Sequence, residues 1–171
     1  MTSQKLVVVS GLPGSGKSTI ADGVSRALSV PVFSIDPIEA AMWRNGIAKN
    51  QTGIAAYEVA AALAGEHLRL GHSAIIDAVN PIEAPRAGWR ALAANYQAEL
   101  KVIECVCASE ATHRQRIEAR RRNIDGMAEI PWSRVLERRA EYEPWTDQRL
   151  TLDTSGGTAE SLLTDVLDYL R

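Results

Sequence analysis

The sequence predicts an α/β protein in three layers, with a five-stranded parallel sheet, helices on both of its faces and a short helical lid. Short runs rich in β-branched residues alternate with longer segments of helical periodicity, which is typical of parallel strands joined by helices. The first run is followed directly by a glycine-rich turn. Because 171 residues suffice for one well-cored domain and no repeat or linker divides them, we expect a single domain over residues 1–171.

The expected strands are short and end at turn or capping residues. They cover residues 6–9, 31–35, 74–77, 100–106 and 150–152. The expected helices lie at about residues 17–28, 38–45, 54–70, 84–96, 110–121, 132–142 and 159–170. In the last helix apolar residues recur at helical spacing, and Thr158 is placed to cap its N-terminus, so this helix should pack on the sheet and close the domain.

The glycine-rich turn matches the phosphate-binding loop pattern G-x-x-x-x-G-K-[ST]. Its residues are Gly11, Leu12, Pro13, Gly14, Ser15, Gly16, Lys17, Ser18 and Thr19. Backbone N–H groups of such a turn converge on phosphate oxygens, Lys17 adds a positive charge, and the Ser18 hydroxyl can hold Mg²⁺. We therefore expect a P-loop NTPase fold with ATP and Mg²⁺ as cofactors, the alternative being an ordinary turn with a solvated lysine.

Composition and charge narrow the possible partners. The net charge of −2 gives no general attraction for nucleic acid, so any polyanion would have to meet a local patch. No apolar stretch approaches the length of a membrane span, and the chain enters its first strand without the features of a signal peptide, so we expect a cytoplasmic protein that does not engage membranes. Cys105 and Cys107 should share one strand face as buried thiols, because a zinc site would need further ligands.

Polar residues follow the second and third strands, and in this architecture ligands bind beyond the carboxyl ends of strands. Asp36 is placed to act as the general base for an acceptor hydroxyl, or else to cap the next helix. Asp77 is placed to approach Mg²⁺, although an aspartate often ends a strand for other reasons. Asn80 could reach an acceptor, but Asn80-Pro81 is also a common turn pair.

A segment dense in arginine, at about residues 114–131, is the expected lid. Arg116 and Arg120 share a helix face by their i, i+4 spacing, and they are the candidates for binding charge on the transferring phosphoryl group. Arg114, Arg121 and Arg122 are expected to form a solvated basic face or to guide the anionic nucleotide. Trp43 and Arg44, in the helix expected to follow Asp36, lie where an acceptor would have to bind.

Between residues 5 and 142 the order of these features resembles the small P-loop kinases of the group that includes bacteriophage polynucleotide 5′-kinase and chloramphenicol phosphotransferase, which are AAA-type ATP-binding kinases. The resemblance is carried by residues 11–19, Asp36, residues 73–80 with Trp89, Arg116 with Arg120, and the residues Ile130, Pro131, Val135, Leu136, Glu141 and Tyr142. It implies a mobile lid, ATP and Mg²⁺ as cosubstrates, deprotonation of the acceptor by Asp36, and an adenine approached by the loop after the fifth strand.

One departure from that group bears on the substrate. In polynucleotide kinases an arginine three residues beyond the strand-ending aspartate grips the acceptor phosphate, whereas this chain has Glu39. A carboxylate there would repel a phosphorylated acceptor, which favours a neutral or cationic small molecule, although Arg44 could serve an anionic one.

The expected activity is therefore transfer of the γ-phosphoryl group of ATP to a hydroxyl of a small-molecule acceptor. The alternatives are a polynucleotide 5′-hydroxyl kinase and a nucleotide-switched binding protein with slow ATPase activity. A GTPase is disfavoured because the chain has no N-K-x-D string. The sequence leaves the acceptor and the oligomeric state open.

Overall fold

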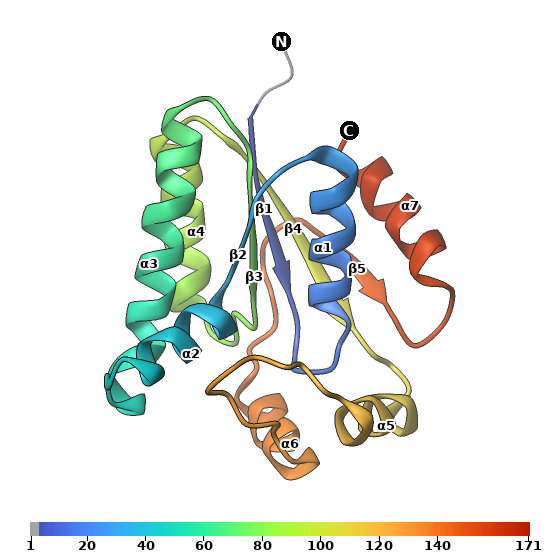
Figure 1. Cartoon of the computed structure of the whole chain (residues 1–171). Helices are drawn as coiled ribbons and strands as arrows, with labels where there is room; N and C mark the ends of the chain where they lie inside the picture. The colour runs from blue at the N-terminus through green and yellow to red at the C-terminus, as the bar shows by residue number, and fades with distance from the viewer. Residues whose placement is uncertain (1–3) are drawn as a thin grey trace.

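The computed structural model describes residues 4–171 and shows a five-stranded sheet with the strand order β2-β3-β1-β4-β5 (Figure 1). The strands are β1 (Lys5–Ser10), β2 (Val32–Ser34), β3 (Ala74–Ala78), β4 (Glu99–Val106) and β5 (Arg149–Asp153). Every pairing is parallel, and each strand lies within one residue of its expected bounds at both ends. The predicted α/β fold class is confirmed.

Helices cover both faces of the sheet. They are α1 (Lys17–Leu28), α2 (Ile35–Arg44), α3 (Lys49–Arg69), α4 (Glu83–Asn95), α5 (Glu110–Ala119), α6 (Trp132–Glu141) and α7 (Ala159–Tyr169). In Figure 1, α1 and α7 lie on one side of the sheet, α3 and α4 on the other, and α5 and α6 at the edge where the strands end. Between residues 4 and 171, no helix combines the length and the apolar character that crossing a bilayer requires.

The two faces of the sheet build two separate cores. On the central strand, Val8 packs toward α3 and α4, while its neighbours Val7 and Val9 pack toward α1 and α7. All three are buried, which explains why this strand is a continuous apolar run instead of an alternating one. Because the strands are paired in parallel within this buried sheet, the polar residues that follow their carboxyl ends lie at one edge of it.

Three helix boundaries differ from the expected ones. Helix α2 begins at Ile35, directly after Ser34, so Asp36 lies in its first turn instead of extending the strand. Pro37 is tolerated there because the first turn of a helix does not use its N–H groups. Helix α3 begins at Lys49, five residues before the expected start. Helix α5 ends at Ala119, and Arg120 is an extended C-cap, so Arg116 and Arg120 do not share a helix face as the spacing suggested.

Candidate active site

The glycine-rich turn connects β1 to α1 with the backbone that a phosphate nest requires. Gly14 and Gly16 have φ angles of 79° and 88°, which side-chain-bearing residues rarely adopt. A Cβ at Gly14 would lie 2.7 Å from the Ile117 side chain, so α5 packs directly against the loop. Lys17, the first residue of α1, is only 5% exposed and lies at the helix N-terminus, where an anion is favoured.

Two neighbouring elements hold this loop from outside. The His113 ring of α5 donates from Nε2 to the Pro13 carbonyl at 2.7 Å, and the Thr154 hydroxyl, just after β5, donates to the Ser15 carbonyl at 2.7 Å. Arg116 in turn donates from Nη1 to the Thr154 hydroxyl at 2.8 Å. The phosphate loop is therefore tied to α5 and to the β5–α7 loop before any nucleotide binds.

His113 lies in no motif of the sequence, but in the structure it supports the phosphate loop. It is 2% exposed, and its Nε2 must carry the hydrogen because a carbonyl can only accept. Its Nδ1 faces the Arg139 guanidinium at 3.5 Å, which favours an unprotonated Nδ1 and hence a neutral ring. Burial is the main cause that lowers the pKa of His113, and the Arg139 charge adds to it. His113 acts as a neutral support for the loop.

The residues Ser18 and Asp77 form a pair that fits a divalent cation. Asp77 Oδ2 accepts hydrogen bonds from the Ser18 hydroxyl at 2.8 Å and the Ser34 hydroxyl at 3.1 Å. Its Oδ1 is buried without any partner, although buried carboxylate oxygens are normally satisfied. No group of three or more His, Cys, Asp or Glu within residues 4–171 could hold a metal by itself. The Ser18 hydroxyl beside the unpartnered Asp77 Oδ1 suits Mg²⁺, which takes few protein ligands and completes its shell with phosphate and water.

Asp36 is contacted by the arginine-rich segment between α5 and α6. Its Oδ2 contacts Arg122 Nη1, and Arg122 Nε lies 3.5 Å from Glu129 Oε2. The Arg122 side chain is only 11% exposed, so the expectation that Arg122 belongs to a solvated face is wrong. The reason is that residues 120–131 leave the helix and fold back over the cleft, which helical spacing could not indicate.

One cleft of about 460 Å³ collects most of the predicted site. It is lined by Gly14, Gly16, Lys17, Ser18, Thr19, Asp22, Val32, Ser34, Asp36, Pro37, Asp77, Arg116, Arg120, Arg121, Arg122 and Ile124. Arg120 Nη1 is buried there without a partner. Burial, followed by the neighbouring Arg122 charge, lowers the pKa of Arg120. The cleft thus places a phosphate nest, two carboxylates and several guanidinium groups around one space.

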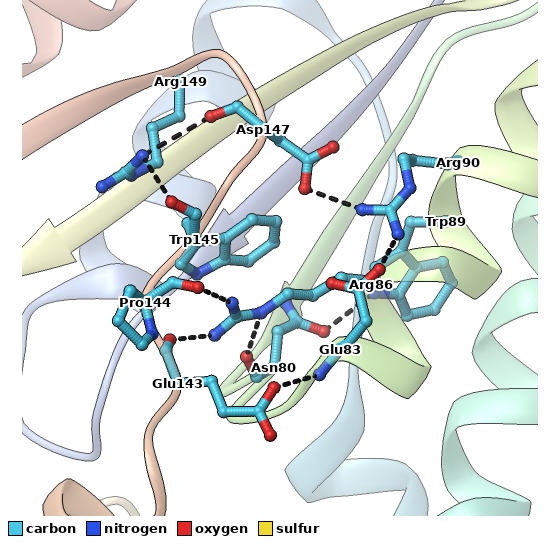
Figure 2. A network of polar contacts seen from close by, with 10 residues as sticks. All are labelled: Asn80, Glu83, Arg86, Trp89, Arg90, Glu143, Pro144, Trp145, Asp147 and Arg149. Atoms are coloured by element: carbon cyan, nitrogen blue, oxygen red, sulfur yellow. Dashed lines mark hydrogen bonds and ion pairs between the residues drawn. The ribbon is translucent and has the colours of Figure 1, made fainter.

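Three predicted acceptor contacts lie outside that lining. The Trp43 indole donates to the Thr52 hydroxyl at 2.8 Å, and Arg44 pairs with Asp125 at 3.6 Å. Asn80 is fully buried, and its Oδ1 accepts from the Trp89 indole at 2.8 Å (Figure 2). The geometry of Asn80 corrects the expectation of an acceptor contact and fits the turn interpretation, because its side chain is already used in the core.

Sequence reasoning also missed a buried arginine near Asn80. Arg86 is 1% exposed, and Figure 2 shows its guanidinium enclosed by backbone carbonyls. It donates to the carbonyls of Asn80 at 3.0 Å, Pro144 at 2.8 Å and Glu143 at 2.6 Å, and it lies 4.3 Å from the centre of the Trp145 ring. These contacts fix the segment that returns from α6 to β5 against the start of α4. An arginine in an amphipathic helix gives no sequence signal for such burial.

The cysteines differ from each other. Cys105 is buried in β4, and burial raises the pKa of its thiol to about 12. Cys107 lies beyond the end of β4 and is partly exposed, with its Sγ 3.7 Å from Arg116 Nη1. The expectation of two buried thiols on one strand face therefore holds only for Cys105, because β4 ends at Val106.

The parallel sheet, the nest between β1 and α1 and the acid at the end of β3 define the fold of P-loop NTPase kinases. The chain belongs to an AAA domain family, AAA_33, which matches residues 6–145. The sequence resemblance to P-loop kinases is confirmed at this level, and membership of the polynucleotide kinase and chloramphenicol phosphotransferase group stays a prediction.

Solved structures share this fold over almost the whole chain. A proposed kinase from Chloroflexus aurantiacus is 19% identical with a TM-score of 0.80, over 99% of this chain and 100% of that one. A sugar kinase from Janibacter sp. HTCC2649 is 21% identical with a TM-score of 0.73, over 98% and 94%. The APS kinase of Mycobacterium tuberculosis, in complex with AMPPNP and APS, is 21% identical with a TM-score of 0.68, over 98% of both chains.

Curated relatives occur in mycobacteria. The uncharacterized proteins Mb2027c of Mycobacterium bovis and Rv2004c of Mycobacterium tuberculosis are each 28% identical over 170 residues. The match covers 92% of this chain but 33% of each relative, so the chain spans about a third of their length.

Proposed function

We propose that this chain is a cytoplasmic ATP- and Mg²⁺-dependent phosphotransferase that moves the γ-phosphoryl group to a hydroxyl of a small-molecule acceptor. One observation carries the proposal: the cleft joins the phosphate nest and Lys17 to the carboxylates of Asp36 and Asp77 and to lid arginines. The similar structures support it, since they include a sugar kinase, a gluconokinase and an APS kinase with bound AMPPNP.

The nucleotide would be held from one side of the cleft. The loop amides and Lys17 bind the outer phosphates, as expected at a helix N-terminus. Arg116 is held by two hydrogen bonds to Thr154. We therefore assign it to supporting the nucleotide-binding side of the cleft and not to contacting the acceptor. Arg120, buried without a partner, is the lid arginine that we assign to the charge developing on the phosphoryl oxygens.

Asp36 would accept the proton of the acceptor hydroxyl. Arg122 contacts Oδ2, whereas Oδ1 makes no hydrogen bond within residues 4–171. One carboxylate oxygen is thus held in place while the other is free to receive a proton, the arrangement that a positioned base requires. We regard Arg122 as a positioning residue that acts through Asp36.

Ser18 and Asp77 would hold Mg²⁺, with the unpartnered Asp77 Oδ1 reaching it directly or through water. When bound, the ion would neutralise charge on the phosphate oxygens. Ser34 would keep the Asp77 carboxylate oriented through its hydrogen bond.

The test is ADP release measured with ATP, Mg²⁺ and a panel of hydroxyl compounds: sugars, sugar acids, amino alcohols and 5′-hydroxyl oligonucleotides. We expect at least one small molecule to stimulate release, and Asp36→Asn to lower the stimulated kcat by about 10²–10⁴-fold. Stimulation that survives Asp36→Asn at full rate would remove Asp36 as the base. Stimulation by oligonucleotides alone would favour the polynucleotide kinase, and stoichiometric ATP binding without any acceptor would favour the nucleotide switch.

A further inference from the structure

The turn between β1 and α1 contains two N–H groups that have no partner in the described chain. Within residues 4–171, the N–H groups of Gly14 and Gly16 donate no hydrogen bond. That of Ser15, between them, donates to the Leu12 carbonyl at 3.1 Å. The φ angle is positive at both glycines but not at Ser15. Such an alternation turns backbone N–H groups into one concavity that suits an anion.

His113 holds the peptide that carries the Gly14 nitrogen. Its Nε2 donates to the Pro13 carbonyl at 2.7 Å, and this carbonyl and the Gly14 N–H belong to one peptide. In a planar trans peptide the carbonyl and the N–H point in opposite directions. The Gly14 N–H therefore points away from His113, and a donor that fixes the carbonyl also fixes the direction of the N–H.

Thr154, directly after β5, holds the peptide that carries the Gly16 nitrogen. Its hydroxyl donates to the Ser15 carbonyl at 2.7 Å, whereas the Val106 carbonyl lies farther away, at 3.1 Å. A Cβ at Gly16 would lie 3.3 Å from the Thr154 side chain, so the two residues are in close contact. By the same peptide geometry, the Gly16 N–H points away from Thr154.

Each of these two donors is in turn held by an arginine. Arg139 of α6 donates from Nη2 to His113 Nδ1 at 3.5 Å, which leaves the hydrogen of the neutral ring on Nε2. Arg116 of α5 donates from Nη1 to the Thr154 hydroxyl at 2.8 Å and from Nη2 to the Thr154 carbonyl at 2.5 Å. A group that accepts a hydrogen bond from a cation becomes a stronger donor, because bonds in a chain polarise one another.

The glycines and the donors lie on opposite sides of the loop. Gly14, Gly16 and Lys17 line the cleft, whereas His113 and Thr154 are not part of its lining. The two N–H groups that are fixed from the donor side therefore point toward the cleft, where the outer phosphates of the nucleotide would lie.

We propose that Arg139 with His113, and Arg116 with Thr154, are two hydrogen-bond relays that hold the N–H groups of the two glycines toward the nucleotide phosphates. All four are positioning residues, because they act through the peptides of the loop. This inference rests on the nucleotide binding of the proposed function. It gives Arg116 a role that acts through Thr154 instead of direct contact with the transferring phosphoryl group.

ATP binding alone tests the inference, so the acceptor need not be known. Thr154→Val removes the hydroxyl and Thr154→Ser keeps it, while His113→Phe removes the donor and His113→Gln keeps one. The matched control is Thr151→Val, which removes an exposed hydroxyl from β5. The Kd for ATP with Mg²⁺ is measured by calorimetry, and the amide resonances of Gly14 and Gly16 are followed by ¹⁵N NMR of the nucleotide-free chain.

We expect Thr154→Val and His113→Phe each to weaken ATP binding by about tenfold, because one charge-assisted contact to phosphate loses its fixed direction. Thr154→Ser, His113→Gln and Thr151→Val should stay within about threefold of the native affinity, since the donors remain. The Gly16 resonance should move in Thr154→Val and the Gly14 resonance in His113→Phe, each more than the other glycine. A general loosening of the fold would move both alike.

Within each relay the effects should not add. Arg116→Gln introduced into Thr154→Val, and Arg139→Gln introduced into His113→Phe, should weaken ATP binding by less than about twofold further, because each arginine acts through the residue already removed. Losses that add in full would overturn the part assigned to that arginine.

Native ATP affinity in Thr154→Val or in His113→Phe would overturn the relay concerned. A loss in Thr154→Ser as large as that in Thr154→Val would do the same, because the hydroxyl would then not be the group that matters. These outcomes leave the proposed function standing, since the native chain binds ATP in each of them. If the native chain does not bind ATP at all, the proposed function itself fails.

Discussion

The two sides of the cleft differ in the contacts that hold their residues in place. On the nucleotide side, the phosphate loop is fixed by hydrogen bonds of 2.7 Å from His113 and Thr154 to its carbonyls, and both donors are buried. On the side toward the proposed acceptor, Arg122 contacts Asp36, and Arg120 Nη1 is buried without a partner. The loop on one side is held in place without a ligand, whereas the other side contains a charge that a ligand would complete.

On the proposed function, this difference reflects what each side would have to bind. The triphosphate tail is a constant part of the proposed ligand, so a preformed nest lowers the cost of binding it. An acceptor must enter and leave, and it must be distinguished from similar molecules, which favours charges that are satisfied only when the correct ligand is present. We therefore expect substitutions on the nucleotide side to reduce binding and those on the acceptor side to reduce turnover or selectivity.

Among substitutions of residues other than the proposed base Asp36, the largest effect should come from Lys17→Ala. Lys17 is buried at the start of α1, and no other lysine lines the cleft. Removing its charge should lower kcat/KM by about a thousandfold, equivalent to about 4 kcal/mol, and should weaken ATP binding measured by calorimetry. Lys49→Ala is the matched control, because Lys49 lies over the Trp43 ring outside the cleft lining. ATP binding by Lys17→Ala at native affinity would contradict a preformed nest.

A smaller effect is expected for Arg122→Gln on the acceptor side. Asp36 would lose the guanidinium that holds Oδ2, so acceptor-stimulated kcat should fall by about 10- to 100-fold as the base loses its orientation. The Kd for ATP should change by less than about threefold. Arg114→Gln is the control, since Arg114 is exposed and pairs with Glu118. If ATP affinity fell as much as kcat did, the two sides would not be separable.

The smallest effect concerns the pH dependence of stability. The pKa of His113 is lowered in the folded chain, so its contribution is present above the ordinary histidine value of about 6.5 and is lost as the pH falls below it. Between pH 7 and pH 5 the free energy of unfolding of the native chain should drop by about 1 kcal/mol more than that of His113→Gln, which keeps a donor without titrating. The measurement is urea unfolding, with His72→Gln as an exposed control. Parallel pH profiles for all three proteins would show that His113 is not held neutral.

Much of the fold and of the candidate site could be predicted because the sequence patterns that indicate them are short and contiguous. The phosphate loop is a contiguous string, and the strands are apolar runs whose bounds lie within one residue of those expected. The carboxyl ends of parallel strands meet at one edge, so Asp36 and Asp77 could be placed on the same cleft from spacing alone. The roles of these residues remain predictions until variants are measured.

The features of the site that could not be predicted depend on where each helix ends and on the path of the chain between α5 and α6. The spacing of Arg116 and Arg120 suggested one helix face, but α5 ends at Ala119 and the two side chains have different surroundings. Arg122 reaches the cleft from a segment without periodicity, so the arginine-rich run could not indicate that its side chain contacts Asp36. Arg120 Nη1 and Arg138 Nε are buried without a hydrogen-bond partner, which a sequence does not reveal.

Arg86 has a consequence for how the cleft can open. Its guanidinium is bound to the carbonyls of Glu143 and Pro144, immediately after α6, and to Asn80 at the end of the β3 connection (Figure 2). The carboxyl end of α6 is thereby anchored to the rigid body of the domain. We therefore expect any opening of the cleft to leave the end of α6 in place and to be taken up by residues 120–131, which form no helix or strand.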